Sequence, residues 1–184
     1  MAEYPSQLAR EHRLFDGRTV TVRPIRPEDA PRVREFLNEL SGETKYMRFQ
    51  KWVHAPSDKL VHFLTDIDYD RHMALVCTAT GAGGEEIVGE ARYVADSEGR
   101  SCELGIVIGD AWHRTGIAGL LMEALLRAAR ERGIRRMEGF VLSANSEMLR
   151  FVRALGFAVE PVPGDRTMVR ISRGLRDAPA SRER

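Results

Sequence analysis

Apolar and polar residues alternate along residues 18–25, "RTVTVRPI", and this pattern predicts a β-strand with one buried face. Short apolar runs bounded by glycine, aspartate or serine predict further strands at residues 72–80, 86–96, 101–110, 134–142, 157–162 and 167–172. Apolar residues spaced three and four apart predict helices at residues 26–40, 41–53, 57–71, 112–133 and 145–156. Antiparallel strands followed by alternating strands and helices predict a mixed α/β sheet with helices on its faces.

The most regular of these helices reads "WHRTGIAGLLMEALLRAARERG" over residues 112–133. Its charged face carries Glu123 four residues before Arg127, and Gly133 stands where a left-handed cap ends a helix. The opposite face is apolar, and it consists of Ile117, Leu120, Leu121, Ala124, Leu125 and Ala128. We therefore expect one face of this helix to be buried.

The start of the same helix is unusual because Gly116, Ala118 and Gly119 lie close together. Such residues lower helix stability, yet they leave the first backbone N–H groups uncovered where the helix dipole is positive. This arrangement predicts an anion site, most naturally for phosphate. The alternative is that the small residues only allow close packing against a neighbouring strand. The sequence has neither the G-x-x-x-x-G-K-S/T motif nor the G-x-G-x-x-G motif for phosphate.

Length and composition predict one globular domain. The chain has 184 residues, of which 43% are hydrophobic and 30% are charged. We expect a polar lead-in at residues 1–17, a single domain at residues 18–172 and a polar, basic, disordered tail at residues 173–184. The net charge of +1 gives no general attraction to nucleic acid or to an anionic membrane, so partners must be inferred from a site.

Cysteine and histidine positions argue against a metal or redox centre. Cys77 and Cys102 lie in apolar runs without a C-x-x-C spacing, and we expect them in the core of a protein from a reducing compartment. The histidines show neither H-x-x-x-H nor H-E-x-x-H spacing, so no metal is expected. The chain shows no signal-peptide segment and no apolar run long enough to span a bilayer. These features predict a cytoplasmic location.

Three segments, "CELGIVIGDAW", "HRTGIAGLL" and "LSANSEMLRFVRALGFAVE", together resemble the GNAT superfamily of N-acetyltransferases. The resemblance spans residues 18–172. It implies a mixed, mostly antiparallel sheet of six to seven strands with helices on both faces, in which the family's fourth and fifth strands splay apart. The segments "VRPIRPEDAPRVREFLNELSGETKYMRF" and "LTDIDYDRHMALV" look like the catalytic domain of bacterial Pat-type protein lysine acetyltransferases.

The family pattern Gln/Arg-x-x-Gly-x-Gly/Ala falls on residues 113–118, where histidine replaces the usual first residue. The resemblance implies acetyl-CoA as co-substrate and no metal, with the pantetheine arm paired to the backbone of Val107 and Ile108 like an added strand. Asn145 matches a family position near that arm, although an asparagine before a helix is also a cap. The residues expected at the pyrophosphate are His113, Arg114, Thr115, Gly116, Ile117, Ala118 and Gly119.

Acetyl transfer requires a neutral amine, whereas a lysine with a pKa of about 10.4 is protonated at neutral pH. A general base is therefore needed. Glu103 stands where many family members carry it, and Glu90 on the preceding strand is the alternative. The backbone N–H of Ile108 is expected to stabilise the charge on the thioester oxygen. Val152 occupies a position where many relatives place a tyrosine acid, so water or Ser146 protonates the thiolate, or it leaves unaided.

The acceptor is expected to meet the segment after the first helix. The resemblance implies a substrate rim of Tyr46, Arg48, Asp66 and Asp68 with Phe49 beside them, and Glu90 is also expected on the substrate side. The acidic members favour a cationic acceptor. The alternative is a packed aromatic cluster with solvated acidic residues. A protein lysine is the leading hypothesis. A small amine such as a polyamine, an amino acid or an antibiotic is the nearest alternative, and a non-catalytic acyl-CoA sensor is an alternative from another class. A homodimer is a hypothesis by analogy with relatives.

Overall fold

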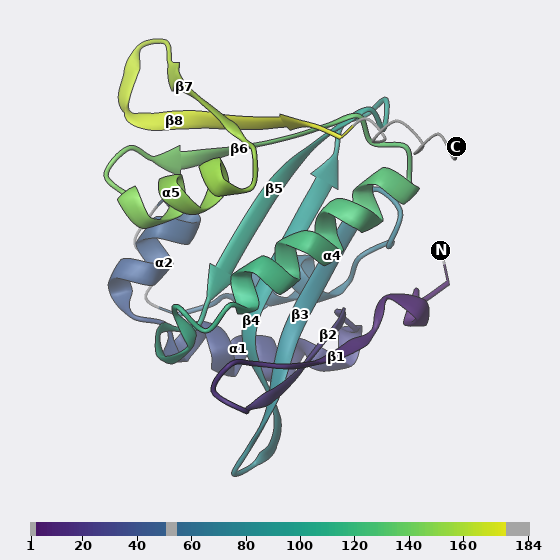
Figure 1. The fold of residues 1–184 in the computed structure, drawn as a ribbon. Helices are drawn as coiled ribbons and strands as arrows, with labels where there is room; N and C mark the ends of the chain where they lie inside the picture. The colour runs from purple at the N-terminus through teal and green to yellow at the C-terminus, as the bar shows by residue number, and fades with distance from the viewer. Residues whose placement is uncertain (1–2, 51–54, 176–184) are drawn as a thin grey trace, which may run out of the picture.

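The computed structural model describes residues 3–50 and 55–175, which form one mixed sheet with helices on both faces (Figure 1). In this part of the chain, eight strands are joined in the order β1-β2-β3-β4-β5-β6-β8-β7. Every neighbouring pair is antiparallel except β5 with β6. The strands are β1 (Arg10–Arg13), β2 (Thr19–Pro24), β3 (His72–Gly81), β4 (Gly84–Ala95), β5 (Ser101–Ile108), β6 (Arg136–Leu142), β7 (Ala158–Val162) and β8 (Asp165–Gly174).

The strand beyond the expected six to seven is β1. Its four residues, "REHR", are all polar, so they lack the hydrophobic alternation that predicts a strand. β1 instead forms by pairing with β2, from Arg10 opposite Val22 to Arg13 opposite Thr19. The expected lead-in at residues 1–17 therefore contributes an edge strand to the sheet.

The described helices lie on two sides of the sheet. They are α1 (Ala30–Glu39), α2 (Gly42–Phe49), α3 (Asp58–Thr65), α4 (Ile117–Glu131) and α5 (Ser146–Ala154). Figure 1 shows α4 crossing one face over β3, β4 and β5, whereas α1 lies behind the sheet and α2 lies to the left of β5, which it contacts. Ser57 caps the start of α3, because its side chain accepts a hydrogen bond from the N–H of Leu60 at 3.1 Å. Residues 51–53 of the predicted second helix lie outside the described residues.

Helix α4 buries the apolar face that its sequence predicts. Ile117, Leu121 and Leu125 are fully buried, whereas Glu123 and Arg127 are exposed. The helix packs against β2, β3, β4 and β5. This packing fixes the start of α4 next to the end of β5, where the candidate chemistry lies.

Cys77 and Cys102 are core residues, as the sequence predicts. Both are free and buried. Burial raises the pKa of each thiol to about 12, so neither is ionised at neutral pH. Packing, rather than thiol chemistry, is therefore their role.

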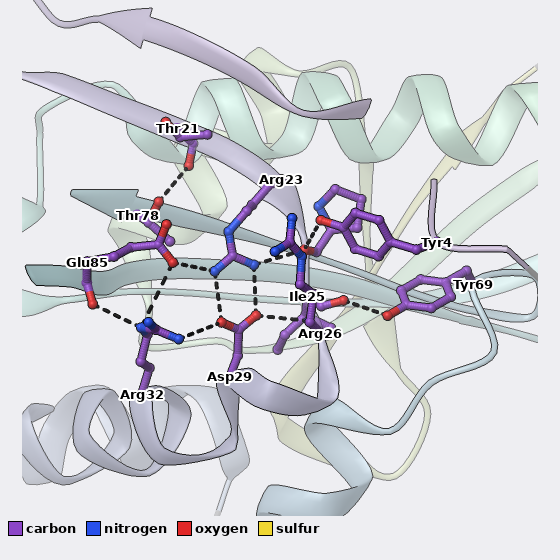
Figure 2. A network of polar contacts seen from close by, with 11 residues as sticks. Tyr4, Thr21, Arg23, Ile25, Arg26, Asp29, Arg32, Tyr69, Thr78 and Glu85 are labelled. Atoms are coloured by element: carbon purple, nitrogen blue, oxygen red, sulfur yellow. Dashed lines mark hydrogen bonds and ion pairs between the residues drawn. The ribbon is translucent and has the colours of Figure 1, made fainter. Parts of the chain in front are cut away.

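A buried ion pair fixes the connection from β2 to α1 (Figure 2). Arg23 donates to both carboxylate oxygens of Asp29, at 2.7 and 2.8 Å, and both side chains are buried. Glu85, at the start of β4, contacts the same guanidinium at 2.5 Å. The guanidinium of Arg32 in α1 lies 3.4 Å from Asp29. Charges from two strands and a helix thus hold α1 against the back of the sheet.

The described fold extends past the expected domain end. β8 continues to Gly174 and Leu175 is buried, so the boundary expected at residue 172 falls inside a strand. Residues 176–184 of the expected disordered tail lie outside the described residues. None of the described helices combines the length and the hydrophobicity that crossing a membrane requires.

Candidate active site

Strands β5 and β6 pair only where they begin. Ser101 lies opposite Arg136 and Glu103 lies opposite Glu138, after which the register between the two strands ends. Figure 1 shows the strands diverging, while β6 stays paired with β8 along its length. A cavity of about 930 Å³ is lined by residues of both strands. The structure thus contains the splayed pair of strands that the resemblance implies.

Most of the predicted site residues line this cavity. They are Arg48, Glu103, Val107, Ile108, His113, Arg114, Gly116, Ala118, Gly119 and Asn145. Thr115 and Ile117 belong to the same loop and helix start, but their side chains are engaged elsewhere. The hydroxyl of Thr115 donates to the carbonyl oxygen of Trp112 at 2.6 Å, and Ile117 is fully buried in the core. These two residues can offer only backbone groups to a ligand.

Backbone N–H and C=O groups along β5 point alternately toward β4 and toward the cavity. The N–H of Gly109 donates to the carbonyl oxygen of Val88 in β4 at 2.8 Å. Because hydrogen-bonded pairs alternate along an antiparallel ladder, Val107 also turns its backbone toward β4. Ile106 and Ile108 turn theirs toward the cavity. The register therefore contradicts the expectation that the backbone of Val107 faces the cavity to pair with the cofactor, because the backbone groups that do so are those of Ile106 and Ile108.

The loop that enters α4 has the backbone of an anion cradle. Arg114 and Gly116 adopt left-handed conformations, with φ of 61° and 93°, and Gly116 directly precedes the helix. A Cβ added to Gly116 or Gly119 would meet nothing within 4 Å. The alternative that these glycines serve close packing is therefore wrong. Their missing side chains instead leave the positive end of the helix open to the cavity.

His113 ties this loop to β5. Its Nε2 lies 3.1 Å from the carbonyl oxygen of Ile108. Since a carbonyl oxygen only accepts hydrogen bonds, Nε2 carries the proton in this contact. The histidine that replaces the family's usual Gln or Arg therefore braces the protein's own backbone while it lines the cavity.

Helix α2 bridges the two diverging strands, an arrangement that the sequence did not reveal. Asp110, just after β5, accepts hydrogen bonds from the N–H and hydroxyl of Ser41 at 2.9 and 2.8 Å, and from the hydroxyl of Thr44 at 2.7 Å. Burial acts to raise the pKa of Asp110, but these bonds hold it below its usual value. At the other end of α2, Gln50 donates to the carbonyl oxygen of Phe140 in β6 at 3.3 Å.

The start of α5 borders the cavity near the cradle. Asn145 Oδ1 accepts a hydrogen bond from the N–H of Met148 at 3.1 Å, so Asn145 is a cap and also lines the cavity. Glu147 lies 3.7 Å from Nε of Arg114. Both side chains of this pair are exposed, so it contributes little to stability. It does join α5 to the loop where the phosphate is expected.

The two candidate bases have different surroundings. Glu103 is exposed and lines the cavity. Glu90 is buried and contacts the guanidinium of Arg92, which also lies 2.8 Å from Nε2 of His72 and donates to the carbonyl oxygen of Leu64 at 3.0 Å. Burial and the charge of Arg92 lower the pKa of His72 to about 4, so its ring is neutral at pH 7. Glu90 therefore belongs to a structural network, outside the described residues that line the cavity.

The expected substrate rim is only partly assembled. Arg48 lines the cavity, whereas Tyr46, Asp66 and Asp68 are outside the described residues that do so. One carboxylate oxygen of Asp68 accepts from three successive backbone N–H groups, of residues 70–72, each at 2.9 Å. Asp66 lies 3.3 Å from His62. A role of these three residues in acceptor binding stays a prediction.

Residues 19–158 match the family model described as an acetyltransferase (GNAT) domain. The chain belongs to the GNAT acetyltransferase family. The match includes β5, the cradle and α5, each of which lines part of the cavity. The predicted GNAT fold, with its mixed and mostly antiparallel sheet, is confirmed, and the protein is an acyltransferase.

The GNAT chain is similar to proteins that are named as acetyltransferases. It is 38% identical over 156 residues to the acetyltransferase PA5475 of Pseudomonas aeruginosa, and the match covers 85% of this chain and 84% of that one. It is 32% identical over 141 residues to the acetyltransferase Pat of Mycolicibacterium smegmatis, covering 76% of this chain but 41% of Pat. The chain thus spans less than half the length of that relative.

The crystal structure of the GNAT domain of PAT from S. lividans superposes with a TM-score of 0.84 at 32% identity. The comparison covers 94% of this chain and 99% of that domain. The resemblance to Pat-type acetyltransferases is therefore confirmed at the level of the catalytic domain.

Proposed function

We propose that this GNAT enzyme transfers an acetyl group from acetyl-CoA directly to the amine of a protein lysine, with Glu103 as general base. The position of Glu103 carries the proposal. It is the last residue of β5 that pairs with β6, and its exposed side chain stands where the strands begin to diverge and the cavity opens. A base at this point can reach an amine that approaches a thioester held between the strands.

Acetyl-CoA suits the remainder of the cavity. The N–H groups at the start of α4, with open space beside Gly116 and Gly119, suit the pyrophosphate. The cavity-facing backbone of Ile106 and Ile108 suits the amides of the pantetheine arm, as an added strand does. Acetyl-CoA then supplies the thioester that the amine attacks. We propose residues 113–119 for the pyrophosphate, with Asn145 beside the arm.

The N–H of Ile106 is better placed than that of Ile108 to stabilise the thioester oxygen. A strand rises about 3.3 Å per residue, so Ile106 lies about 10 Å and Ile108 about 17 Å along β5 from Glu103. Only the shorter span can be bridged by a glutamate side chain, an amine and, where needed, one water. We therefore propose the N–H of Ile106 for the oxyanion and keep Ile108 for the pantetheine arm.

The proposed transfer needs only these groups. Glu103 takes a proton from the ammonium, directly or through a water, and the amine nitrogen attacks the thioester carbon. The C–S bond breaks as the carbonyl re-forms, which releases the thiolate of CoA, and the nitrogen passes the proton that it still has to lose to this thiolate or to water. Val152 is fully buried and apolar, so it supplies no acid at the tyrosine position of other relatives. A thiol pKa near about 8.5 makes the thiolate a tolerable leaving group without one.

Two observations support a protein lysine as the acceptor. The chain is similar over most of its length to Pat-type catalytic domains. The side chain of Glu103 is also exposed, and a lysine on the surface of a folded protein can approach an exposed carboxylate more easily than a buried one. A small-amine acceptor is the competing function, and the same experiment separates the two.

The experiment incubates the purified protein with radiolabelled acetyl-CoA and a desalted cell lysate, then separates proteins from small molecules. Glu103→Gln and a reaction without enzyme serve as controls, because acetyl-CoA slowly acetylates lysines by itself. Label in a few protein bands above both controls is expected. Label only in a re-added small-molecule fraction would establish the small-amine function instead. Binding of acetyl-CoA with no transfer to either fraction would identify a sensor and refute the enzyme.

A further inference from the structure

Arg48 covers Gly105 inside the cavity. Arg48 lies in the last turn of α2, and Gly105 lies two residues after Glu103 in β5, on the same face of the strand. A Cβ built on Gly105 would lie 2.5 Å from one Nη of Arg48 and 2.7 Å from its Cζ. Glycine at this position therefore admits the guanidinium directly onto the strand. Both residues line the cavity.

The buried Nε of Arg48 has no partner within residues 3–50 and 55–175. Its Nε is inaccessible to solvent and has no hydrogen-bond partner among the residues that the structure describes. Its Cζ lies 5.1 Å from the ring centre of Phe49, a contact that stabilises the charge but satisfies none of the N–H groups in the guanidinium plane. Burial lowers the pKa of Arg48. A buried donor of this kind is costly unless a ligand pairs with it.

Nearby charges do not supply the missing partner. Glu90 acts to raise the pKa of Arg48, but its carboxylate already contacts Arg92, which stands opposite Gly105 in β4. Glu103 acts in the same direction, yet it is exposed and is the proposed base. Glu90 is thus engaged with Arg92 and Glu103 is exposed, so the buried Nε of Arg48 has no carboxylate partner among the described residues. A negatively charged substrate group is the natural complement.

We propose that Arg48 is a carboxylate-binding group that recognises a carboxylate carried by one of the two substrates. The inference rests on the proposed function, because it needs donor and acceptor to meet in this cavity. A planar guanidinium donates two parallel hydrogen bonds to the two oxygens of a carboxylate. A neutral substrate group at the same place would form weaker hydrogen bonds with it. The guanidinium of Arg48 covers Gly105, which lies between Glu103 and Ile106 in β5. A carboxylate on either substrate is therefore within its reach. Either the enzyme accepts a dicarboxylic acyl thioester as a donor in addition to acetyl-CoA, or the acceptor is a lysine flanked by Asp or Glu.

Two stable coenzyme A thioethers test the donor as the source. S-(3-carboxypropyl)-coenzyme A carries the carboxylate, and S-butyl-coenzyme A is its neutral match. If the donor carries the carboxylate, calorimetry shows that the wild-type protein binds the first compound about tenfold more tightly or better. Arg48→Met then removes this difference and changes the affinity for the butyl compound by less than about twofold.

Two lysine peptides test whether the acceptor carries the carboxylate that Arg48 is proposed to bind. One carries glutamate next to the lysine, and the other carries glutamine at that position. With acetyl-CoA as donor, kcat/KM of the wild-type enzyme is expected to favour the glutamate peptide about tenfold if the acceptor carries the carboxylate. Arg48→Met then brings the ratio of the two peptides close to one.

Three further variants are measured in both the donor test and the acceptor test. Gly105→Ala displaces the guanidinium without removing it, so it is expected to lose the same preference as Arg48→Met. Arg48→Lys keeps the charge without the planar fork and is expected to keep part of the preference. Arg127→Met, on the exposed face of α4, is the matched control and should behave like the wild type. Thermal unfolding of each variant reports whether its fold is intact.

Three results overturn the carboxylate site. The first is the absence of a carboxylate preference from both arms in the wild type. The second is a preference that survives both Arg48→Met and Gly105→Ala. The third is an equal loss with every ligand in Arg48→Met, which would mean that Arg48 serves the reaction in general. Acetylation of the neutral peptide reports the proposed function separately, so the two failures can be told apart.

Discussion

The Nε2 of His113 lies 3.1 Å from the carbonyl oxygen of Ile108, and this contact joins the last residue of β5 to the loop that enters α4. The two segments are proposed to hold different parts of acetyl-CoA, namely the pantetheine arm and the pyrophosphate. A hydrogen bond between them fixes their relative position before the cofactor binds. Affinity for acetyl-CoA should therefore depend on this bond even if the imidazole never contacts the ligand.

His113→Ala is expected to weaken binding of acetyl-CoA about three- to tenfold, because a hydrogen bond of this kind contributes about 1 kcal/mol. His113→Gln keeps an N–H donor and should retain most of the affinity. Isothermal titration with CoA and the KM for acetyl-CoA are the measurements. His62→Ala, in the exposed part of α3, is the matched control. Unchanged affinity in His113→Ala would show that the contact does not organise the cradle.

Gly119→Ala should separate stability from cofactor binding. A Cβ at Gly119 meets nothing within 4 Å, and alanine favours a helix over glycine by up to about 1 kcal/mol, so the melting temperature should stay or rise. The same Cβ enters the space proposed for the pyrophosphate, so affinity for acetyl-CoA should fall by about tenfold or more. Thermal unfolding and calorimetry measure the two effects.

Gly133→Ala is the control for Gly119→Ala, because it is expected to change stability and not affinity for acetyl-CoA. Gly133 has a φ of 76° at the other end of α4, so alanine there is strained and should lower stability without changing affinity for acetyl-CoA. If Gly119→Ala binds acetyl-CoA as the wild type does, the pyrophosphate does not lie at this helix start.

The elements that could be predicted from sequence are those whose pattern is local. α4 repeats apolar residues such as Ile117, Leu121 and Leu125 with helical spacing, and these residues are buried. β1 could not be predicted because "REHR" has no apolar residue, and only its pairing with β2 makes it a strand. The fold continues past the expected end at residue 172 for a related reason, since Arg173 and Gly174 are polar or small but continue β8 beside β6.

The candidate site also has one part that a local sequence pattern predicts and other parts that depend on contacts between distant segments. The cradle is contiguous in sequence, so its glycines mark it. The contacts of Asp110 with Ser41 and of Arg48 with Gly105 join distant segments, and no local pattern indicates either. Which backbone groups of β5 face the cavity also depends on the pairing with β4, which a one-residue shift would reverse. The sequence alone therefore does not distinguish Val107, whose backbone faces β4, from Ile106, whose backbone faces the cavity.

Glu103→Gln should lower kcat about 10²- to 10⁴-fold, which is the usual contribution of a general base. The KM for acetyl-CoA should change little, because the proposed cofactor contacts come from other residues. Initial rates at saturating amine over a range of pH are the measurement. Glu138→Gln, directly opposite in β6, is the matched control and should keep wild-type turnover.

Glu90→Gln is expected to act differently, because it breaks a buried contact with Arg92 and should therefore lower stability. Wild-type turnover in Glu103→Gln at saturating amine would remove Glu103 from the mechanism. A selective loss of kcat in a stably folded Glu90→Gln enzyme would instead assign the base to Glu90.

Asp29→Asn tests the buried network that holds α1 against the sheet. Removing the buried carboxylate leaves Arg23 with only the partly exposed Glu85 as a charged partner, so the free energy of unfolding should fall by up to about 3–5 kcal/mol. Burial acts to raise the pKa of Asp29, but hydrogen bonds from Arg23 and from the N–H of Arg26 hold it below 3.8. The stabilisation by the carboxylate is therefore complete above the unfolded-state pKa of about 3.8 and is lost as the pH falls through the lower folded-state pKa.

The wild-type protein should accordingly lose more stability between pH 6 and pH 3 than Asp29→Asn does. Guanidinium chloride unfolding at both pH values measures this difference, and ionic strength is held constant so that exposed ion pairs contribute equally. Asp58→Asn is the matched control, since Asp58 pairs with Arg34 at an exposed position and its loss should change stability little. Equal pH dependence in the wild type and Asp29→Asn would show that the charge of Asp29 does not stabilise the fold. The start of α1 would then depend on apolar packing by Val33, Phe36 and Leu37, which are buried.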